Sequence, residues 1–366
     1  MFRKNNTAVR ARAALEKISD YRPARTLESV KREYGFSDVI KLAGNENRLG
    51  CSPRAVEAVK NAGLLPYYPD TNCTKLREKL ASVYKTGEAD FIFGNGSFEL
   101  ISLIAQTFLE PGGESVIPVP SFGWYTNVTL QMNAVPVFVS LTDFKIDLDS
   151  IRKKITDKTK IIWICNPNNP TGTLLGQNEL INFLETVGND IIVVLDEAYI
   201  DFISEDYPDT VYLLKKFTNV ILLRTFSKVY GLASFRIGFG MTNPEIIRNM
   251  NKVRIPINVN TLAQEAALAS LDDADFRKKV LENNREGLEL YYAELEKLGL
   301  NYIRSNGNFI LFDTGKDSTW VEAEFLKRRI VIRPAAEFGL PTWVRISIGT
   351  REDNAEVIRV LEEIIK

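Results

Sequence analysis

Short apolar runs recur along the first two thirds of the chain, and a polar segment follows each of them. The runs span residues 91–93, 116–120, 161–165, 191–195 and 220–223. Runs of this length that are apolar at almost every position are typical of strands buried on both faces of a parallel sheet. In such a sheet the polar residues that follow the strands meet at one edge, and we expect the functional groups there.

The pattern becomes helical after residue 240. Apolar residues recur at spacings of three and four, which predicts helices, and short apolar runs between them predict strands. The predicted helices span residues 244–252, 262–271, 275–298, 319–329 and 351–365, and the predicted strands span 300–303, 308–313, 330–333 and 343–348. We therefore expect an α/β fold with a large domain at 41–255 and a small domain at 256–366, to which residues 1–40 add an arm and part of the small domain.

The 366-residue chain has the composition of a globular protein, with 45% apolar and 25% charged residues. Its formal net charge is −1 without a long block of one sign, so neither nucleic acid nor an anionic membrane is expected as a partner. The sequence has no apolar run of about 18 residues, the length of a membrane span. The basic first 17 residues lack a secretory apolar core. They suit a soluble arm, with a transit peptide as the alternative, and we expect a cytoplasmic protein.

The chain contains no histidine and only three cysteines, which are widely separated. The first fact excludes imidazole metal ligands and Ser–His or Cys–His nucleophile systems. The second gives no sign of a disulfide framework or a thiolate metal site, so no metal is expected. A group other than imidazole must carry protons near neutral pH, and a lysine is the natural candidate.

Two of the apolar runs end in residues with complementary chemistry. A polar turn that contains Lys228 follows the run at 220–223, and Asp196 and Tyr199 follow the run at 191–195. One rim of the sheet therefore collects a lysine, a carboxylate and a phenol. A lysine that forms a Schiff base with pyridoxal 5′-phosphate (PLP) needs an acidic partner for the pyridine nitrogen of the cofactor. Lys228 and Asp196 supply that pair.

Three segments carry a resemblance to a known family: CNPNNPTG at 165–172, DEAY at 196–199 and RTFSKVYGLASFRIG at 224–238. They resemble the fold-type I PLP-dependent aminotransferases of class I/II, and most closely the histidinol-phosphate aminotransferases. This resemblance implies a large domain with a mostly parallel seven-stranded sheet covered by helices, and a smaller α/β C-terminal domain. It also implies PLP as the cofactor and a homodimer.

The resemblance also implies roles for individual residues. Lys228, Asp196 and Tyr199 take the catalytic positions, and the last two also contact the cofactor. The remaining cofactor contacts are implied for Ser97, Phe98, Phe122, Asn169, Thr225, Ser227 and Arg236, and for Tyr68 of the partner subunit. At Ser97 the sequence itself supports the role, because a strand, a glycine-rich turn and a helix start together make an anion site.

Substrate contacts are implied for Tyr21, Asn47, Arg333 and Arg345. The planar guanidinium of Arg345 suits a carboxylate or a phosphate. The residues alone leave two alternatives open: Tyr21 lies in a segment that suits a surface loop, and a strand arginine such as Arg333 more often forms a salt bridge at the rim. Trp124 and Tyr125, just after the implied stacking ring, are candidates for walls of the substrate pocket.

The chain departs from the family pattern at three positions near the implied pocket. Arg48 stands where proline is usual, Phe98 where aspartate is usual, and Ile257 where phenylalanine is common. Arg48 is either a solvated surface charge or a residue that alters the recognition of an acidic substrate group. Because of these departures the identity of the substrate stays open.

The implied activity is transfer of the amino group of histidinol phosphate to 2-oxoglutarate, which yields imidazole acetol phosphate and glutamate in histidine biosynthesis. An aromatic amino acid or another amino-alcohol phosphate is an alternative donor, and a phospho-amino-acid decarboxylase on the same scaffold is an alternative enzyme. A PLP-binding regulator would carry a DNA-binding module ahead of the PLP domain, whereas this chain reaches its PLP-domain motifs by residue 45. The expected partners are therefore a small-molecule amino donor, a 2-oxo acid and a second copy of the chain.

Overall fold

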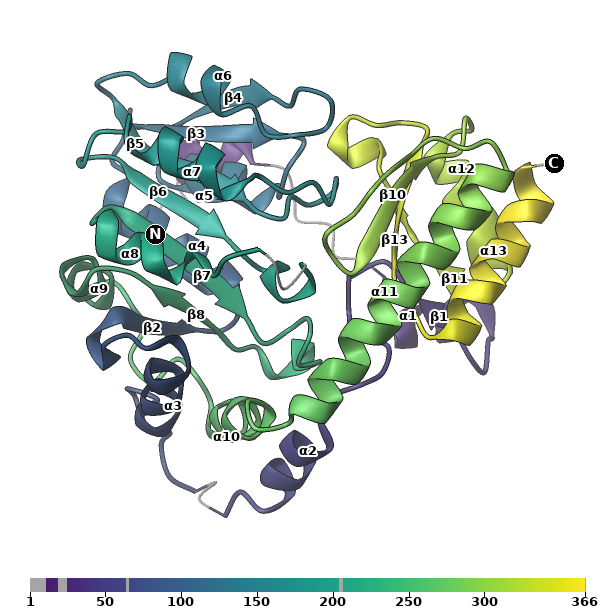
Figure 1. Ribbon diagram of the computed structural model, residues 1–366, viewed down its shortest axis with the longest axis horizontal. Helices are drawn as coiled ribbons and strands as arrows, with labels where there is room; N and C mark the ends of the chain where they lie inside the picture. The colour runs from purple at the N-terminus through teal and green to yellow at the C-terminus, as the bar shows by residue number, and fades with distance from the viewer. Residues whose placement is uncertain (1–10, 19–24, 64–65, 204–206, 366) are drawn as a thin grey trace, which may run out of the picture.

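The computed structural model has two lobes (Figure 1) and describes residues 11–18, 25–63, 66–203 and 207–365. A seven-stranded sheet of order β2-β8-β7-β6-β5-β3-β4 forms the centre of the larger lobe. Its strands are β2 (Phe91–Gly94), β3 (Glu114–Val119), β4 (Val135–Ser140), β5 (Thr159–Cys165), β6 (Ile192–Asp196), β7 (Val220–Thr225) and β8 (Gly238–Met241). Within this sheet β8 is the one strand that runs opposite to all the others, so the predicted mostly parallel sheet is confirmed.

Both faces of the large sheet are buried, as the continuous apolar runs predict. In β5, Ile162 and Ile164 face one hydrophobic cluster while Ile161 and Trp163 face another, because successive side chains of a strand point to opposite faces. The first cluster includes residues of α2 (Pro53–Lys60), α3 (Thr74–Tyr84), α6 (Leu148–Lys153), α7 (Gln177–Leu184), α8 (Leu213–Lys216) and α10 (Thr261–Ser270). The second includes residues of α4 (Ser97–Phe108), α5 (Trp124–Gln131) and α9 (Pro244–Asn251).

The smaller lobe is an antiparallel sheet of order β12-β13-β10-β9 that packs against three helices. Its strands are β9 (Tyr302–Ile303), β10 (Phe309–Asp313), β12 (Arg333–Pro334) and β13 (Trp343–Ser347), and its helices are α11 (Ala274–Lys297), α12 (Ser318–Lys327) and α13 (Arg351–Ile365). Nearby, β1 (Ile40–Lys41) pairs in parallel with β11 (Ile330–Val331), and α1 (Leu27–Tyr34) packs beside them. The segment from α1 to β1 thus packs against the C-terminal lobe. The domain boundaries at 40/41 and 255/256 stay a prediction.

Capping side chains mark where several helices begin. Ser52, Asn243 and Asp317 cap α2, α9 and α12 by accepting hydrogen bonds from backbone N–H groups of the first turn. Thr350 accepts such a bond from the backbone of Asp353 at the start of α13. Short 3-10 segments lie at Ala13–Lys17, Glu88–Asp90, Ile200–Phe202, Thr210–Tyr212, Ala233–Phe235 and Ala336–Phe338. Within the described ranges, no helix is long and apolar enough to cross a bilayer.

The carboxyl ends of β3, β5, β6 and β7 meet at one edge of the large sheet, and this edge faces the smaller lobe (Figure 1). β2 runs in the same direction, because it is antiparallel to β8, which is antiparallel to β7. The start of α4 therefore lies at the same edge. This is the edge at which the polar residues after the apolar runs were expected to gather.

Arg48 connects the two lobes. Its guanidinium donates two hydrogen bonds to the carboxylate of Asp353, from Nε at 2.7 Å and from Nη2 at 3.0 Å. Only 9% of the Asp353 side chain is exposed, so the pair is partly shielded from water. This contact contradicts the first interpretation made from the sequence, whereas an effect of Arg48 on substrate recognition stays a prediction. Arg48 is not a solvated charge, and a carboxylate of the chain itself occupies its guanidinium.

Replacing Arg48 by alanine is expected to lower the free energy of unfolding by about 1–3 kcal/mol, because it leaves a nearly buried carboxylate without its cation. Urea denaturation measures the loss. Arg359, which pairs with Glu356 on the exposed side of α13, is the control. Arg359→Ala should cost less, since exposed ion pairs contribute little. Equal losses in the two variants would contradict the structural role of Arg48.

Candidate active site

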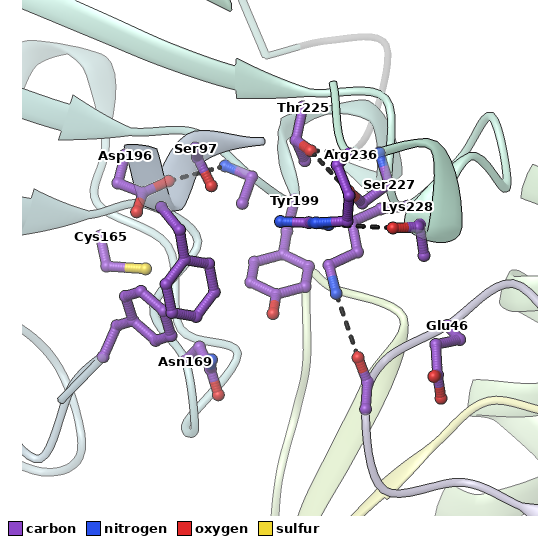
Figure 2. Close-up of a pocket in the computed structure, with 15 residues that line it drawn as sticks. Glu46, Ser97, Cys165, Asn169, Asp196, Tyr199, Thr225, Ser227, Lys228 and Arg236 are labelled. Carbon is purple, nitrogen blue, oxygen red and sulfur yellow. Dashed lines mark hydrogen bonds between the residues drawn. The ribbon is translucent and has the colours of Figure 1, made fainter. Parts of the chain in front are cut away.

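A cavity of about 290 Å³ opens at the carboxyl edge of the large sheet (Figure 2). It is lined by Gly44, Glu46, Ser97, Phe98, Phe122, Cys165, Asn169, Asp196, Ala198, Tyr199, Thr225, Ser227, Lys228, Ala233 and Arg236. This set includes every residue for which the family resemblance implies a cofactor contact, except Tyr68. The fold therefore brings together groups that are more than a hundred residues apart in the chain.

One part of the cavity has the features of an anion site. α4 begins at Ser97, and no side chain in the described part of the chain caps it, so the N–H groups of its first turn can bind a phosphate. Gly96 has a φ of 73°, and a Cβ there would lie 2.5 Å from Nη2 of Arg236, so glycine is needed for this close approach. Thr225 and Ser227 add hydroxyl groups that lie 3.0 Å apart. These donors fit the phosphate of PLP.

The carboxylate of Asp196 lies on the other side of the cavity from Lys228 (Figure 2). Asp196 ends β6 and is 3% exposed, and this burial raises its pKa. The hydroxyl of Tyr125 donates to Oδ2 at 2.6 Å and the N–H of Ala198 donates to Oδ1 at 3.3 Å, and both bonds oppose the effect of burial on the pKa. A buried carboxylate with neutral donors suits a protonated pyridine nitrogen, because that cation would compensate its charge.

Lys228 follows β7 and points its amine into the cavity (Figure 2). Its Nζ donates to the carbonyl oxygen of Gly44 at 3.1 Å and lies 5.6 Å from the ring centroid of Tyr199. Burial lowers the pKa of Lys228 to about 8, and the positive charge of Arg345 acts in the same direction. Near that pH a large share of the amine is neutral, as a nucleophile and a proton acceptor must be.

The lowered pKa of Lys228 predicts how the apo-protein captures PLP. The neutral amine is the reactive form, so the rate of capture should rise with pH and level off above about pH 8. An ordinary lysine, with a pKa of about 10.4, would continue to gain rate well beyond about pH 9. Stopped-flow absorbance measures the rate, with Lys228→Ala as the control for capture by other amines. A rate that climbs as it does for an ordinary lysine would contradict the prediction.

A second group of polar side chains faces the cavity between these ends. The hydroxyl of Tyr199 accepts a hydrogen bond from Asn45 at 2.9 Å, and burial raises the pKa of Tyr199 to about 12, so the phenol stays protonated and can donate. Oδ1 of Asn169 accepts a hydrogen bond from Nη1 of Arg345 at 2.5 Å, which leaves the amide nitrogen to donate elsewhere. Tyr199 and Asn169 could thus both donate to the phenolic oxygen of PLP. Arg345 reaches the site through this contact with Asn169.

Phe122 supplies an aromatic face to the cavity. Its ring meets those of Phe98 and Tyr125 edge-on, with centroids 5.0 and 5.5 Å away. Trp124 packs against Phe98 with centroids 5.4 Å apart. Neither Trp124 nor Tyr125 is among the residues that line this cavity. Tyr125 is fully buried, so the prediction that it forms a wall of the substrate pocket is wrong, whereas a contact of Trp124 with a substrate stays a prediction. The ring of Trp124 packs on that of Phe98, and the ring of Tyr125 packs on that of Phe122.

The other residues with predicted contacts are not among those that line the cavity. The side chain of Asn47 donates to a backbone carbonyl oxygen at 3.0 Å. Arg333 donates two hydrogen bonds, of 2.5 and 2.6 Å, to Glu337, as the salt-bridge alternative predicts. Tyr68 is 88% exposed, and Tyr21 lies outside the described residues. Contacts of these residues with a substrate or a partner stay predictions.

Several lining residues were not singled out from the sequence. Gly44 and Glu46 belong to a segment whose asparagines and glycines mark an irregular loop but give no indication that it approaches Lys228. Cys165 ends β5, and its register partner in β6 is Asp196. Its place at the rim could have been predicted from the pairing of these two strands.

The arrangement as a whole fits PLP. The start of α4 at Ser97 would hold the phosphate, and Asp196 would face the ring nitrogen. Asn169 and Tyr199 would donate to the phenolic oxygen, and Lys228 would bond to the reactive carbon. A cavity with a lysine of lowered pKa and a buried carboxylate on its opposite side supports chemistry in which charge moves from a substrate into a cofactor ring.

Comparisons with known proteins agree with this chemistry. Residues 37–361 match the family described as aminotransferase class I and II. The histidinol-phosphate aminotransferase of Caldicellulosiruptor saccharolyticus is 44% identical over 97% of this chain and 99% of its own length. Histidinol-phosphate aminotransferase 2 of Carboxydothermus hydrogenoformans is 41% identical over 97% and 99%. The solved structure of the histidinol-phosphate aminotransferase from Sinorhizobium meliloti in complex with pyridoxal-5′-phosphate has a TM-score of 0.90 at 25% identity, with 98% of each chain covered. The chain therefore belongs to the class I and II aminotransferases, in the PLP-dependent family of the histidinol-phosphate aminotransferases.

Proposed function

We propose that the protein transfers the amino group of histidinol phosphate to 2-oxoglutarate, which yields imidazole acetol phosphate and glutamate. Full-length identity of 40–44% to relatives with this name carries the proposal. The site supports it with a cation for an anionic substrate group. Arg345 is buried and held by Asn169 and by the carbonyl oxygen of Ala43, and Arg333 is its register partner in the adjacent strand. Arg333 is paired with Glu337, so Arg345 is the cation of the two that suits a phosphate or a carboxylate.

The residues of the site divide the work of such a transfer. When bound, PLP supplies an electron-withdrawing ring that stabilises negative charge at the Cα of the amino donor. Asp196 would keep the ring nitrogen protonated, since its own buried charge needs a cation. Nζ of Lys228, neutral above its lowered pKa, would remove the proton from Cα of the donor. Tyr199 would stay protonated and donate to the phenolic oxygen.

The absorbance of the PLP-loaded protein tests the proposal in two half-reactions. Histidinol phosphate added without an acceptor should convert the cofactor to its amine form, and 2-oxoglutarate added afterwards should restore the first spectrum. An unchanged spectrum with histidinol phosphate would overturn the proposed donor. Phenylalanine and serinol phosphate then test the alternative donors. Release of carbon dioxide from phosphoserine without a 2-oxo acid would indicate a decarboxylase instead.

We also propose that the protein acts as a homodimer in which Tyr68 contributes to the site of the other subunit. In the chain taken alone, Tyr67 and Tyr68 are 73% and 88% exposed, although large aromatic side chains are costly to leave in water. Ile255, at 67%, is a further exposed apolar side chain. A phenol at a subunit interface gains both burial and a hydrogen-bond partner. A cytoplasmic location stays a prediction.

Subunit mixing tests the proposed role of Tyr68. Tyr68→Ala and Lys228→Ala are each expected to be nearly inactive as homodimers. In a mixed dimer, one site combines Lys228 of one subunit with Tyr68 of the other and is intact. In an equal mixture, random pairing makes about half of the dimers mixed, and one of the two sites in each mixed dimer is intact. About a quarter of the wild-type activity should therefore return. Mixtures that stay as inactive as the separate variants would contradict a contribution of Tyr68 across the interface.

A further inference from the structure

Tyr125 lies behind the cavity and contacts two of the residues that line it. Its side chain, on α5, is fully buried. Its hydroxyl donates to Oδ2 of Asp196 at 2.6 Å, and its ring meets the ring of Phe122 at an angle of 79° with centroids 5.5 Å apart. One buried side chain therefore links the carboxylate and the aromatic face of the site, although it does not line the cavity itself.

A buried support holds Tyr125 in this position. Its ring stacks on Trp163 of β5, with centroids 4.8 Å apart and planes 9° from parallel. Nε1 of Trp163 in turn donates to Oγ of Ser115 on β3 at 2.7 Å. Trp163 and Ser115 are fully buried as well. Stacking and buried hydrogen bonds restrict side-chain rotation, so the hydroxyl of Tyr125 is directed at Asp196 before any cofactor binds.

We propose that Tyr125 is a positioning residue that fixes the carboxylate of Asp196 for the ring nitrogen of PLP. Its hydrogen bond engages Oδ2, and the N–H of Ala198 engages Oδ1 from the side of the backbone. An ionised carboxylate has about four acceptor sites, so two such donors leave others to face the cavity. The inference rests on the proposed pairing of Asp196 with that nitrogen.

The same hydrogen bond helps to keep Asp196 ionised. Burial raises the pKa of Asp196, and the bond from Tyr125 is the largest effect that lowers it. Three further titratable groups face this carboxylate: the thiol of Cys165, the phenol of Tyr199 and the amine of Lys228. Burial raises the pKa values of Cys165 and Tyr199, so both stay neutral at ordinary pH. Lys228 stays mainly positive below its pKa of about 8, so Asp196 is the group of this cluster whose charge changes on the acid side of that pH.

Tyr125→Phe isolates the contribution of the hydroxyl, because phenylalanine keeps the ring stack and the packing. The Tm of the apo-protein is measured from about pH 4, near the ordinary pKa of an aspartate, up to about pH 7. We expect the Tm deficit of the variant to grow with pH, because the hydroxyl binds the ionised carboxylate more strongly than the neutral one. In an Asp196→Asn background the deficit should not depend on pH.

Tyr291→Phe is the matched control for this measurement. Tyr291 is a fully buried tyrosine in the core of the smaller lobe, and its hydroxyl has no hydrogen-bond partner among the described residues. Removing this hydroxyl should shift the Tm by the same amount at every pH. A Tm deficit of Tyr125→Phe that is equally constant would overturn the coupling between Tyr125 and Asp196.

The affinity for PLP tests the positioning role. We expect Tyr125→Phe to raise the Kd for PLP about tenfold near pH 7.5 and to lower kcat, with the KM for the amino donor unchanged. Tyr125→His keeps a ring with an N–H donor and should recover part of the affinity. If Tyr125→Phe does not fold, the Kd and kcat of Tyr125→His are compared with those of the wild type instead. Unchanged Kd and kcat in Tyr125→Phe would overturn the proposal even if its Tm deficit depends on pH.

Asp196→Asn separates this inference from the function on which it rests. If Asp196→Asn leaves the Kd for PLP unchanged, the pairing of Asp196 with the cofactor fails, and the role of Tyr125 fails with it. If Asp196→Asn weakens PLP binding while Tyr125→Phe does not, only the role of Tyr125 is wrong. If both variants bind PLP more weakly, with the smaller effect in Tyr125→Phe, the result supports both the pairing of Asp196 with the cofactor and the positioning role of Tyr125.

Discussion

Lys228→Ala is expected to lower kcat for amino transfer about 10⁴-fold or more. The change removes both the amine that bonds to PLP and the base that takes the proton from Cα of the donor. A general acid–base group alone contributes about 10²–10⁴-fold, so the combined loss should reach or exceed the upper end of that range. The variant should still bind PLP, because the start of α4 and Arg236 remain in place to hold the phosphate. Single-turnover absorbance on the reconstituted variant measures the loss.

Lys228→Arg separates the chemistry of the amine from its charge. Arginine keeps the positive charge but does not lose its proton in proteins, so it can neither attack a carbon nor accept a proton. We expect it to be as inactive as the alanine variant. Lys252→Ala, which changes an exposed lysine at the end of α9, should keep full activity. If Lys228→Arg worked within about tenfold of the wild-type rate, Lys228 would act only as a charge and the proposed chemistry would fail.

The large sheet and its functional edge were predictable because they depend on local features of the sequence. In β5 and β6 every residue from 161 to 165 and from 192 to 195 is apolar, and each strand is buried on both faces, so the continuous pattern was sufficient. The residue that begins the polar segment after each strand, such as Asp196, then had to lie at the carboxyl edge. Geometry of this kind requires no knowledge of how distant segments meet.

Contacts between distant segments were not predictable in this way. Tyr125 and Asp196 are 71 residues apart, and Arg48 and Asp353 are 305 residues apart. Whether Tyr125 faces the cavity or the core depends on how α5 is rotated against the sheet, and the stack on Trp163 determines that rotation. Strands as short as β1 and β11, with two residues each, carry no periodic signal from which their pairing could be read.

Asp196→Asn is expected to lower amino transfer about 10²–10³-fold, since removing one partner of a buried charged pair costs about 2–5 kcal/mol. Asparagine cannot hold the ring nitrogen of PLP protonated, so the affinity of the variant for PLP should fall as well. The stability of the apo-protein, in contrast, should increase in this variant. Burial raises the pKa of Asp196, so its ionised form destabilises the empty site, and asparagine removes that charge. At pH 8 we expect the apo-variant to have a higher Tm than the wild type, and the difference should shrink as the pH falls and Asp196 becomes neutral.

Glu197, the next residue, is the matched control for this prediction. Its carboxylate is equally buried, but it accepts a hydrogen bond from Nε of Arg224 at 2.8 Å, whereas the donors to Asp196 are neutral. Glu197→Gln weakens a buried ion pair and should therefore lower the free energy of unfolding by about 3 kcal/mol. It should leave the spectrum of bound PLP unchanged, because Glu197 does not line the cavity. Two adjacent carboxylates should thus respond with opposite signs: amide substitution at Asp196 stabilises the apo-protein and abolishes most activity, whereas at Glu197 it destabilises the fold. A lower Tm for apo Asp196→Asn at pH 8 would mean that Asp196 supports the fold rather than the cofactor.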